Sequence, residues 1–242
     1  MEFLINIFHT LLYQPLFNAL ILLYQFIPGQ DFGIAIIVLT ILIKIIFYPL
    51  TTQAIKSQKI LNELQPKIRE LQQKFKEDKE KQAKEIIAFY QKEKINPFSG
   101  CLPILIQLPI LLALFQVFKE GFGPEQMIHL YNFVPHPETV NLIFFGIINL
   151  GNSNIIIAVL TGIAQFFQSR ALLPKIKKVK KEIDQMSQIS AIMQKQMLYF
   201  LPFFTFFVLL TLPSAMGIYW LTTSLFSIGQ QHLILKHQNA KS

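Results

Sequence analysis

Long apolar stretches without charged residues constrain this chain more than any other feature of its sequence. About 20 residues of α-helix, at a rise of about 1.5 Å each, cross a hydrocarbon core of about 30 Å. Only 15% of the 242 residues are charged, which is little for the surface of a water-soluble fold. The last apolar run, 197–235, is long enough for two helices, and its only break is Leu212-Pro213-Ser214. The sequence therefore predicts an all-α polytopic membrane protein with five spans at 32–50, 99–118, 154–173, 197–212 and 213–235.

The basic residues are concentrated between these runs. Most of the 22 Lys and Arg residues lie in 51–95 and 174–196, and the tail 236–242 adds two more. By contrast, 119–153 contains only Lys119, and no basic residue precedes Lys44. Because cytosolic loops of membrane proteins are enriched in Lys and Arg, we expect the N-terminus outside, the C-terminus in the cytosol and 119–153 as an extracytoplasmic loop. This distribution argues against nucleic-acid binding as a primary role, despite the net charge of +8.

The first 27 residues are apolar with one polar stripe. The stripe consists of Asn6, Thr10, Gln14, Asn18 and Gln25. This pattern predicts an amphipathic helix over 1–27 that lies in the outer membrane interface. A sixth span or an uncleaved signal is the alternative, although a secretory signal normally begins with basic residues.

The segment 51–95 has the composition of an exposed helical hairpin, because Gln, Glu and Lys favour helix. A coiled-coil spacing joins Leu61, Leu64, Ile68, Leu71 and Phe75, and Ala83, Ile87 and Tyr90 continue an apolar stripe after a polar turn over 76–81. We expect two antiparallel helices in the cytosol, the first bent or interrupted by Pro66, which lacks an N–H. The hairpin either docks an incoming chain or only sets topology, and its length and seam favour docking.

Lys44 is a single charge inside the first predicted span. Such a charge costs about 2.5–3.5 kcal/mol on insertion scales, and none of the five spans contains Asp or Glu to pair with it. The side chain either extends to the cytosolic headgroups or lies in a hydrated groove. Polar residues on other spans favour a groove, and we expect its substrate-binding residues to be Lys44, Thr40, Gln107, Gln165 and Trp220, with Gln168, Thr223, Ser227 and Gln230 nearby.

Four motifs follow one another along the chain: KIIFYPL at 44–50, QPKIRELQQKF at 65–75, NPFSGCLPILIQLPI at 96–110 and LPSAMGIYWLTTSLFSIGQQHLI at 212–234. In this order and spacing, the chain resembles the YidC family of membrane protein insertases. The resemblance implies five core helices around a hydrophilic groove, open to the cytosol and the lipid, in a bacterial plasma membrane. It implies that nascent membrane proteins are guided through this groove into the lipid bilayer, alone or with the Sec translocon and the ribosome. No nucleotide, metal or other cofactor is implied.

The chain departs from the family pattern at three points. Lys44 stands where the family usually has Arg, so the charge is kept but the planar fork that binds a carboxylate twice is lost. The large extracytoplasmic domain and the lipoprotein-type Cys of some members are expected to be absent. The tail 236–242 is expected to be too short for strong ribosome tethering.

Two other classes of function deserve comparison. A small-solute transporter or channel is the alternative function, although the internal repeats and paired intramembrane charges of such folds are missing from the sequence. An enzyme is not expected, because the spans contain no acid and the five His residues show no catalytic or metal-ligand spacing.

Overall fold

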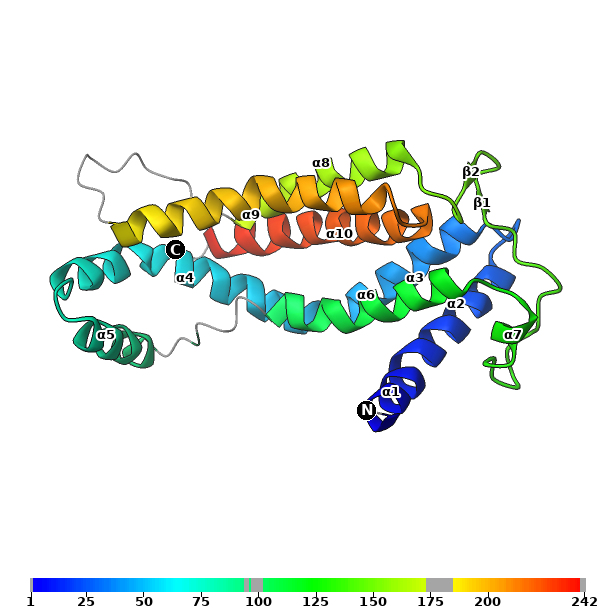
Figure 1. The fold of residues 1–242 in the computed structure, drawn as a ribbon, viewed down its shortest axis with the longest axis horizontal. Coiled ribbons are helices and arrows are strands. Elements are labelled where there is room, and N and C mark those ends of the chain that lie inside the picture. Colours follow the sequence, from blue (N-terminus) through cyan, green and yellow to red (C-terminus); the bar gives the residue numbers. More distant parts are fainter. Residues whose placement is uncertain (1, 94–95, 97–101, 173–184, 240–242) are drawn as a thin grey trace.

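Helices that run side by side make up most of the molecule, and the N-terminal helix runs obliquely to them (Figure 1). The computed structural model describes residues 2–93, 96, 102–172 and 185–239, so Cys101 and half of the predicted basic loop 174–196 lie outside the described residues. The helices are α1 (Glu2–Phe8), η1 (His9–Tyr13, a π-helical turn), α2 (Gln14–Phe26), α3 (Phe32–Ile46), α4 (Tyr48–Lys74), α5 (Lys79–Lys92), α6 (Leu102–Glu120), α7 (Pro124–Met127), α8 (Ile155–Leu172), α9 (Gln185–Leu209) and α10 (Ser214–Asn239).

The helix α10 lies at the centre of this arrangement and packs against α8, α3, α4 and α6, while α9 packs against α8. The contact with α8 is close because Gly217 has no side chain, and a Cβ there would lie 2.5 Å from Cγ2 of Ile157. Thr161 on α8 adds a hydrogen bond of 3.2 Å to the Gly217 carbonyl. Small residues and hydroxyl groups are the usual means of joining helices in a membrane.

Helix length and hydropathy identify few spans by themselves. Among the described residues, one helix, Ile5–Phe26, passes both criteria alone, and Phe32–Ile46 with Tyr48–Lys74 pass them together across a bend of 66°. Ile155–Ala171 and Leu198–Leu209 are apolar but shorter. Polar residues along helices such as α10 lower the mean hydropathy where they face other helices rather than lipid.

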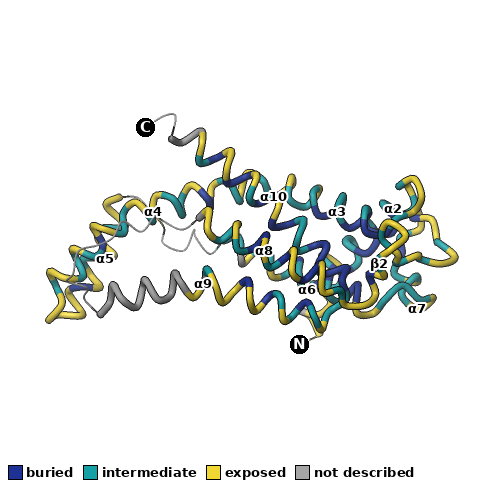
Figure 2. The backbone as a smooth tube through the Cα atoms, turned by 90° about the horizontal axis from the view of Figure 1, so that it is seen from above, coloured by how far each residue is buried: buried dark blue, intermediate teal, exposed yellow. Residues whose placement is uncertain are grey.

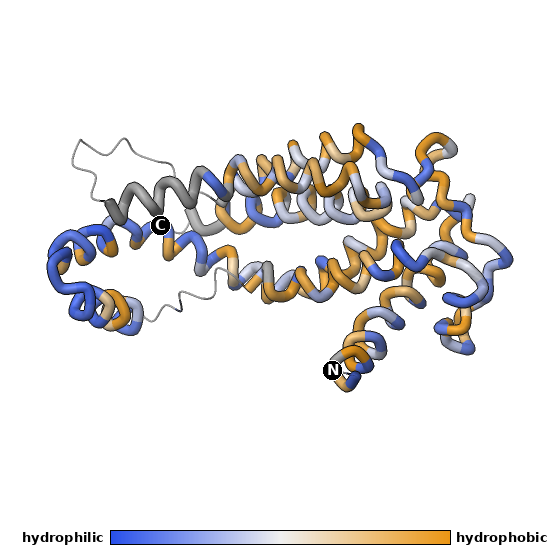
Figure 3. The backbone as a smooth tube through the Cα atoms, viewed as in Figure 1, coloured by the Kyte–Doolittle hydropathy of each residue, from blue (hydrophilic) through white to orange (hydrophobic). Residues whose placement is uncertain are grey.

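The outer faces of α8 and α9 are strongly apolar. Their exposed side chains include Ile156, Leu160 and Phe167 on α8 and Phe200, Phe203 and Phe204 on α9. Figure 3 shows hydrophobic residues along the parallel helices and hydrophilic residues over α4 and α5. A continuous apolar surface of this kind suits a hydrocarbon environment and would be unstable in water.

The hydrophobic core lies at the end of the bundle near α2, where buried residues gather in Figure 2. Aromatic rings from α2, α3 and the chain after α6 form much of it. Phe17 stacks on Phe122 with ring centroids 6.0 Å apart, and Phe32 meets Phe122 edge to face at 4.7 Å. Such pairs add about 0.5–1.5 kcal/mol to the burial of their rings, so this end is firmly held.

The segment 119–153 covers this end and is fixed to the helices by specific hydrogen bonds. Asp31 begins α3 by accepting from the Ile34 N–H at 3.0 Å, and its second carboxylate oxygen accepts from the Phe145 N–H at 2.7 Å. Tyr24 accepts from the Asn141 N–H at 2.9 Å. The segment also contains the strands β1 (Ile143–Phe144) and β2 (Ile148–Asn149), which pair antiparallel, so the all-α prediction misses one short hairpin.

The polar stripe of the N-terminal helix faces this segment in part. Asn18 is buried, donates to the His129 carbonyl at 2.9 Å and accepts from the Tyr131 N–H at 2.6 Å. Gln14 also donates to the His129 carbonyl, at 3.1 Å. These two residues therefore bind protein backbone, whereas the exposed Asn6 and Thr10 remain free to face an interface.

Three helix boundaries differ from the predicted ranges. The range 32–50 is divided by the bend at Phe47, between α3 and α4. The helix α9 begins at Gln185, inside the predicted loop 174–196, and α10 continues to Asn239, inside the predicted tail. The extension of α9 is rich in Gln, Ser, Met and Ala, and that of α10 consists of Lys, His, Gln and Asn. A helix continues through such residues once it is anchored by packing.

The hairpin α4–α5 differs in two details from the hairpin that the sequence predicts. The helix α4 is not interrupted at Pro66, which is exposed, so water can replace the missing backbone hydrogen bond. The alternative, a bend at Pro66, stays a prediction. In α5 the buried residue is Gln82, whose side chain donates to the Gln72 carbonyl at 2.5 Å. Ala83 and Ile87 are exposed, so the predicted stripe of α5 was on the wrong face by one residue.

Replacing Asn18 tests the attachment of 119–153. We expect Asn18→Leu to lower the free energy of unfolding by about 1–3 kcal/mol, because the Tyr131 N–H loses its partner in a buried place. Thermal unfolding in detergent, followed by helical circular dichroism, measures the change. Asn6→Leu, on the exposed part of the same helix, is the control, and equal melting temperatures for the two variants would contradict the assignment.

Candidate functional site

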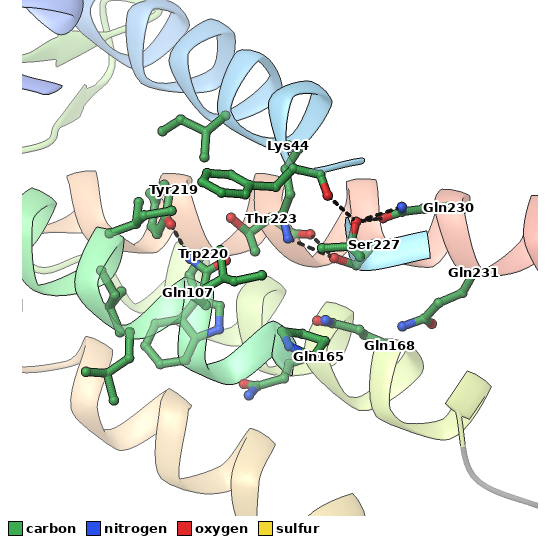
Figure 4. Close-up of a pocket in the computed structure, with 18 of the residues that line it drawn as sticks. Lys44, Gln107, Gln165, Gln168, Tyr219, Trp220, Thr223, Ser227, Gln230 and Gln231 are labelled. Atoms are coloured by element: carbon green, nitrogen blue, oxygen red, sulfur yellow. Dashed lines mark hydrogen bonds between the residues drawn. The ribbon is translucent and has the colours of Figure 1, made fainter. Parts of the chain in front are cut away.

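A cavity of about 340 Å³ lies between α3, α6, α8 and α10, at the end of the bundle opposite the aromatic core. Figure 4 shows side chains from these helices converging on it. Its walls combine aliphatic residues of α6 with polar residues of α8 and α10. The lining residues include Ile43, Lys44, Phe47, Thr51, Ile106, Gln107, Ile110, Leu111, Gln165, Gln168, Tyr219, Trp220, Thr223, Ser227, Gln230 and Gln231.

Lys44 extends from α3 into this cavity (Figure 4). Its Nζ donates to Oγ of Ser227 at 3.2 Å, and Ser227 donates in turn to the Thr223 carbonyl at 2.8 Å. Among the described residues, no carboxylate lies within ion-pair distance of Lys44. An ammonium has three donors, so one neutral hydroxyl leaves its charge and two of its donors available to a ligand or to water.

Two further predicted residues, Gln107 of α6 and Trp220 of α10, line one wall of the cavity. Gln107, in the second turn of α6, donates from Nε2 to the hydroxyl of Tyr219, which joins α6 to α10. Trp220 is half-buried and presents its ring to the cavity (Figure 4). This wall therefore offers an apolar surface with few polar groups, which is typical of ligand sites.

The opposite wall carries carboxamide groups. Gln165 and Gln168 come from α8 and Gln231 from α10, and Figure 4 shows them across the cavity from Lys44. Gln165 is 5% exposed and Gln231 is 2% exposed. The Oε1 atoms of both are buried without a hydrogen-bond partner in the described part of the chain.

The structure brings together four of the five predicted site residues, and Thr40 is the exception. Thr40 is not among the lining residues, because it is fully packed and its hydroxyl donates to the Ile36 carbonyl of its own helix at 2.6 Å. Threonine often satisfies its hydroxyl in this way. Thr40 therefore needs no polar cavity, although it lies one helical turn from Lys44. The sequence reasoning missed Tyr219 and Gln231, although both adjoin the predicted stripe Trp220, Thr223, Ser227 and Gln230.

Gln230 joins the cavity to the hairpin. The helices α3 and α4 meet at a bend of 66° at Phe47, and Gln230 lies beside the first turn of α4 after this bend. Its Nε2 donates to Oγ1 of Thr51 at 2.8 Å, with Thr52 Oγ1 at 3.1 Å and the Tyr48 carbonyl at 3.2 Å. A side chain that is 4% exposed therefore fixes the direction in which the hairpin leaves the bundle.

The groups that line the cavity and the apolar outer faces of the helices define a class of protein. The described residues contain no group of three or more His, Cys, Asp or Glu residues that could hold a metal ion. The described residues give the cavity one cation, neutral hydrogen-bonding groups and apolar walls, between helices with a lipid-like outer surface. This is a helical membrane protein with a partly polar cavity between its helices.

Comparisons with known proteins give the family. Residues 22–241 match the family model of the 60Kd inner membrane protein, and the chain belongs to this family. It is 34% identical over 206 residues to the membrane protein insertase YidC of Fusobacterium nucleatum subsp. nucleatum, which covers 85% of this chain and 87% of that protein. It is 33% identical over 210 residues to the membrane protein insertase YidC of Francisella tularensis subsp. novicida, covering 87% of this chain but only 33% of that protein.

A solved structure shares the fold. The crystal structure of an active YidC insertase with the first transmembrane domain resolved matches with a TM-score of 0.56 and 24% sequence identity. The match covers 90% of this chain and 45% of that chain. The arrangement of helices described above is therefore a known one.

Replacing Gln230 tests its effect on the hairpin. We expect Gln230→Leu to widen the distribution of distances between spin labels at Glu77, near the hairpin tip, and Leu233 on α10, because hydrogen bonds of about 0.5–1.5 kcal/mol each are lost at the bend. Electron paramagnetic resonance in a Cys101→Ser background gives this distribution. His232→Leu, exposed on the same helix, should leave it unchanged, and an equally narrow distribution for Gln230→Leu would show that the bend does not depend on this side chain.

Proposed function

We propose that this protein is a membrane protein insertase, which guides transmembrane segments of nascent proteins from the cytosol into the lipid bilayer. Membership of the 60Kd inner membrane protein family and the names of the two YidC relatives support this function. The single observation that carries it within the molecule is the position of Lys44, a cation that has no carboxylate partner among the described residues and lies in a cavity among apolar helices.

The cavity suits the polar tail of an incoming chain. Moving charged or polar groups from water into hydrocarbon is the main obstacle to inserting a membrane protein, and Lys44 and the carboxamides of Gln165 and Gln231 offer replacement partners for such groups. An acidic group in the tail would pair with Nζ of Lys44, where the apolar walls strengthen the attraction relative to water. The apolar part of the substrate would meanwhile contact the exposed apolar helices and pass into lipid.

The proposed topology places this cavity toward the cytosol. Lys44 lies near the end of α3 that continues into the basic hairpin α4–α5, and basic segments remain on the cytosolic side. In this orientation α3, α6, α8, α9 and α10 are the five spans of a bacterial plasma membrane protein. The covered end, with 119–153, faces outward, and the oblique N-terminal helix lies in the outer interface.

The hairpin is the proposed docking element for the partners that deliver a substrate. It begins beside the cavity, which Thr51 and Ile55 of α4 help to line, and is hydrophilic over most of its length (Figure 3). The ribosome and the Sec translocon are partners of suitable chemistry, the first anionic and the second a membrane neighbour. A small-solute transporter or channel, the alternative function, gains no support from the relatives, which carry the insertase name.

Substitution of Lys44 tests the function and the role of its charge. The protein is reconstituted into liposomes, and insertion of a single-spanning substrate with an acidic, neutral or basic tail is measured by protease protection. We expect Lys44→Arg to retain activity, and Lys44→Ala to lose about tenfold with acidic tails, which corresponds to about 1.4 kcal/mol of lost attraction. Lys44→Glu should be the least active, because it repels those tails.

Two results would contradict these expectations separately. Equal insertion by the parent and Lys44→Ala proteins with all three tails would exclude a role for the charge. Solute flux through liposomes without any insertion of substrate would exclude the insertase function itself.

Cysteine labelling tests the proposed topology. In a Cys101→Ser background, a single cysteine at Asn132 should react with an impermeant reagent added outside the cell. A single cysteine at Lys79, which is equally exposed in the structure, should react only after the membrane is opened. Labelling of Lys79→Cys from outside intact cells would reverse the orientation.

A further inference from the structure

Three buried side-chain oxygens that line the cavity lack hydrogen-bond partners among the described residues: Oε1 of Gln165, Oε1 of Gln231 and Oγ1 of Thr223. The Thr223 hydroxyl can also donate, so only the two carboxamide oxygens are pure acceptors. The Oε1 atoms of Gln165 and Gln231 are buried, and neither side chain makes a hydrogen bond with any other described residue. Both residues line the cavity from adjoining helices, α8 and α10 (Figure 4). Buried polar atoms in native proteins are nearly always satisfied, so these oxygens indicate that donors enter the cavity.

The chemistry of the two groups narrows the kind of donor. A carboxamide oxygen is neutral and accepts from N–H or O–H groups, and the carboxamide as a whole has the same donor and acceptor pattern as a peptide bond. An unfolded polypeptide segment brings one free N–H with every residue except proline. Two glutamines facing the same space can therefore hold an extended backbone whatever its side chains are.

We propose that Gln165 and Gln231 bind the substrate backbone, by accepting hydrogen bonds from N–H groups of an extended, unfolded segment in the cavity. This inference rests on the proposed insertase function and specifies what the cavity recognises. Lys44, on the other side, attracts negative charge, whereas the glutamines act equally on acidic, neutral and basic tails. An insertase must accept many sequences, and recognition of the backbone provides this.

The surroundings of the two glutamines favour a strong contact. Ile106, Ile110 and Leu111 of α6 form an apolar wall of the same cavity, which excludes part of the competing water. In such surroundings a hydrogen bond is stronger than in bulk water. The cavity volume of about 340 Å³ also lies within the range of ligand sites, about 300–1,000 Å³.

A single-atom change in the substrate tests the proposal. Two synthetic single-spanning substrates carry the same neutral tail, one with ordinary amides and one with backbone esters at successive tail positions, so that oxygen replaces each N–H. The full chain in liposomes should insert the amide tail about fivefold faster than the ester tail, the effect of about one neutral hydrogen bond. In Gln165→Met with Gln231→Met, which keeps side-chain length but removes both acceptors, amide and ester tails should insert at the same rate.

Two matched variants separate recognition from damage to the fold. Gln165→Glu keeps an acceptor at the same place and should still prefer the amide tail. Gln116→Met, on α6 at the opposite end from the cavity, should behave as the parent does. Melting temperatures in detergent are compared for all variants, and the amide-to-ester ratio is measured within each variant, so a partial loss of folded protein cancels.

The results distinguish this inference from the proposed function. Equal insertion of amide and ester tails by the parent protein would overturn backbone recognition and leave water as the partner of the two oxygens, with the insertase function intact. A preference for amides that persists in the double Met variant would also overturn it. Insertion of neither tail above the level of empty liposomes would exclude the insertase function, and this inference with it.

Discussion

The charge of Lys44, which has no ion-pair partner among the described residues, is the constraint on which the half of this structure around the cavity depends. A cation between membrane helices is stable only if water, a counter-ion or neutral donors and acceptors surround it. Here the described residues supply a single hydroxyl, from Ser227, and a cavity lined by carboxamides on its far side. The helices α3, α6, α8 and α10 cannot close on one another around such a group without removing its solvation. A cavity is therefore the physical consequence of this residue.

The opposite end of the bundle shows what the same helices do without such a charge. Aromatic rings of α2 and α3 pack tightly with Phe122, and 119–153 is attached to them through Asp31, Asn18 and Tyr24. The aromatic end holds the helices in register, whereas the helices surround a cavity near Lys44. Tight packing and the cavity thus lie in different parts of one set of helices.

Membrane residence and a polar cavity place opposing demands on the same helices. The helix α10 carries hydroxyl and carboxamide groups toward α3, α4 and α8, and these lower its hydropathy below what a span normally shows. Its neighbours α8 and α9 present the apolar surface instead. Hydropathy taken one helix at a time therefore understates how much of this molecule suits a bilayer, because each helix has only part of its surface toward lipid.

The sequence by itself determined the order of the long helices, the break at Pro213 and the presence of a lysine among apolar spans that contain no acid, since these depend on local composition and periodicity. It also predicted Gln107, Gln165 and Trp220 beside Lys44, because helical spacing reports which residues share a face. Only the tertiary structure decided that Thr40 turns back to its own helix, that Asn18 binds 119–153 and that Gln230 holds the bend at Phe47. The physical reason is that a polar side chain can be satisfied locally or across helices with similar energy, and periodicity does not distinguish the two. Which of the two occurs depends on the distance to a partner more than a hundred residues away along the chain. Only the packing of the helices sets that distance.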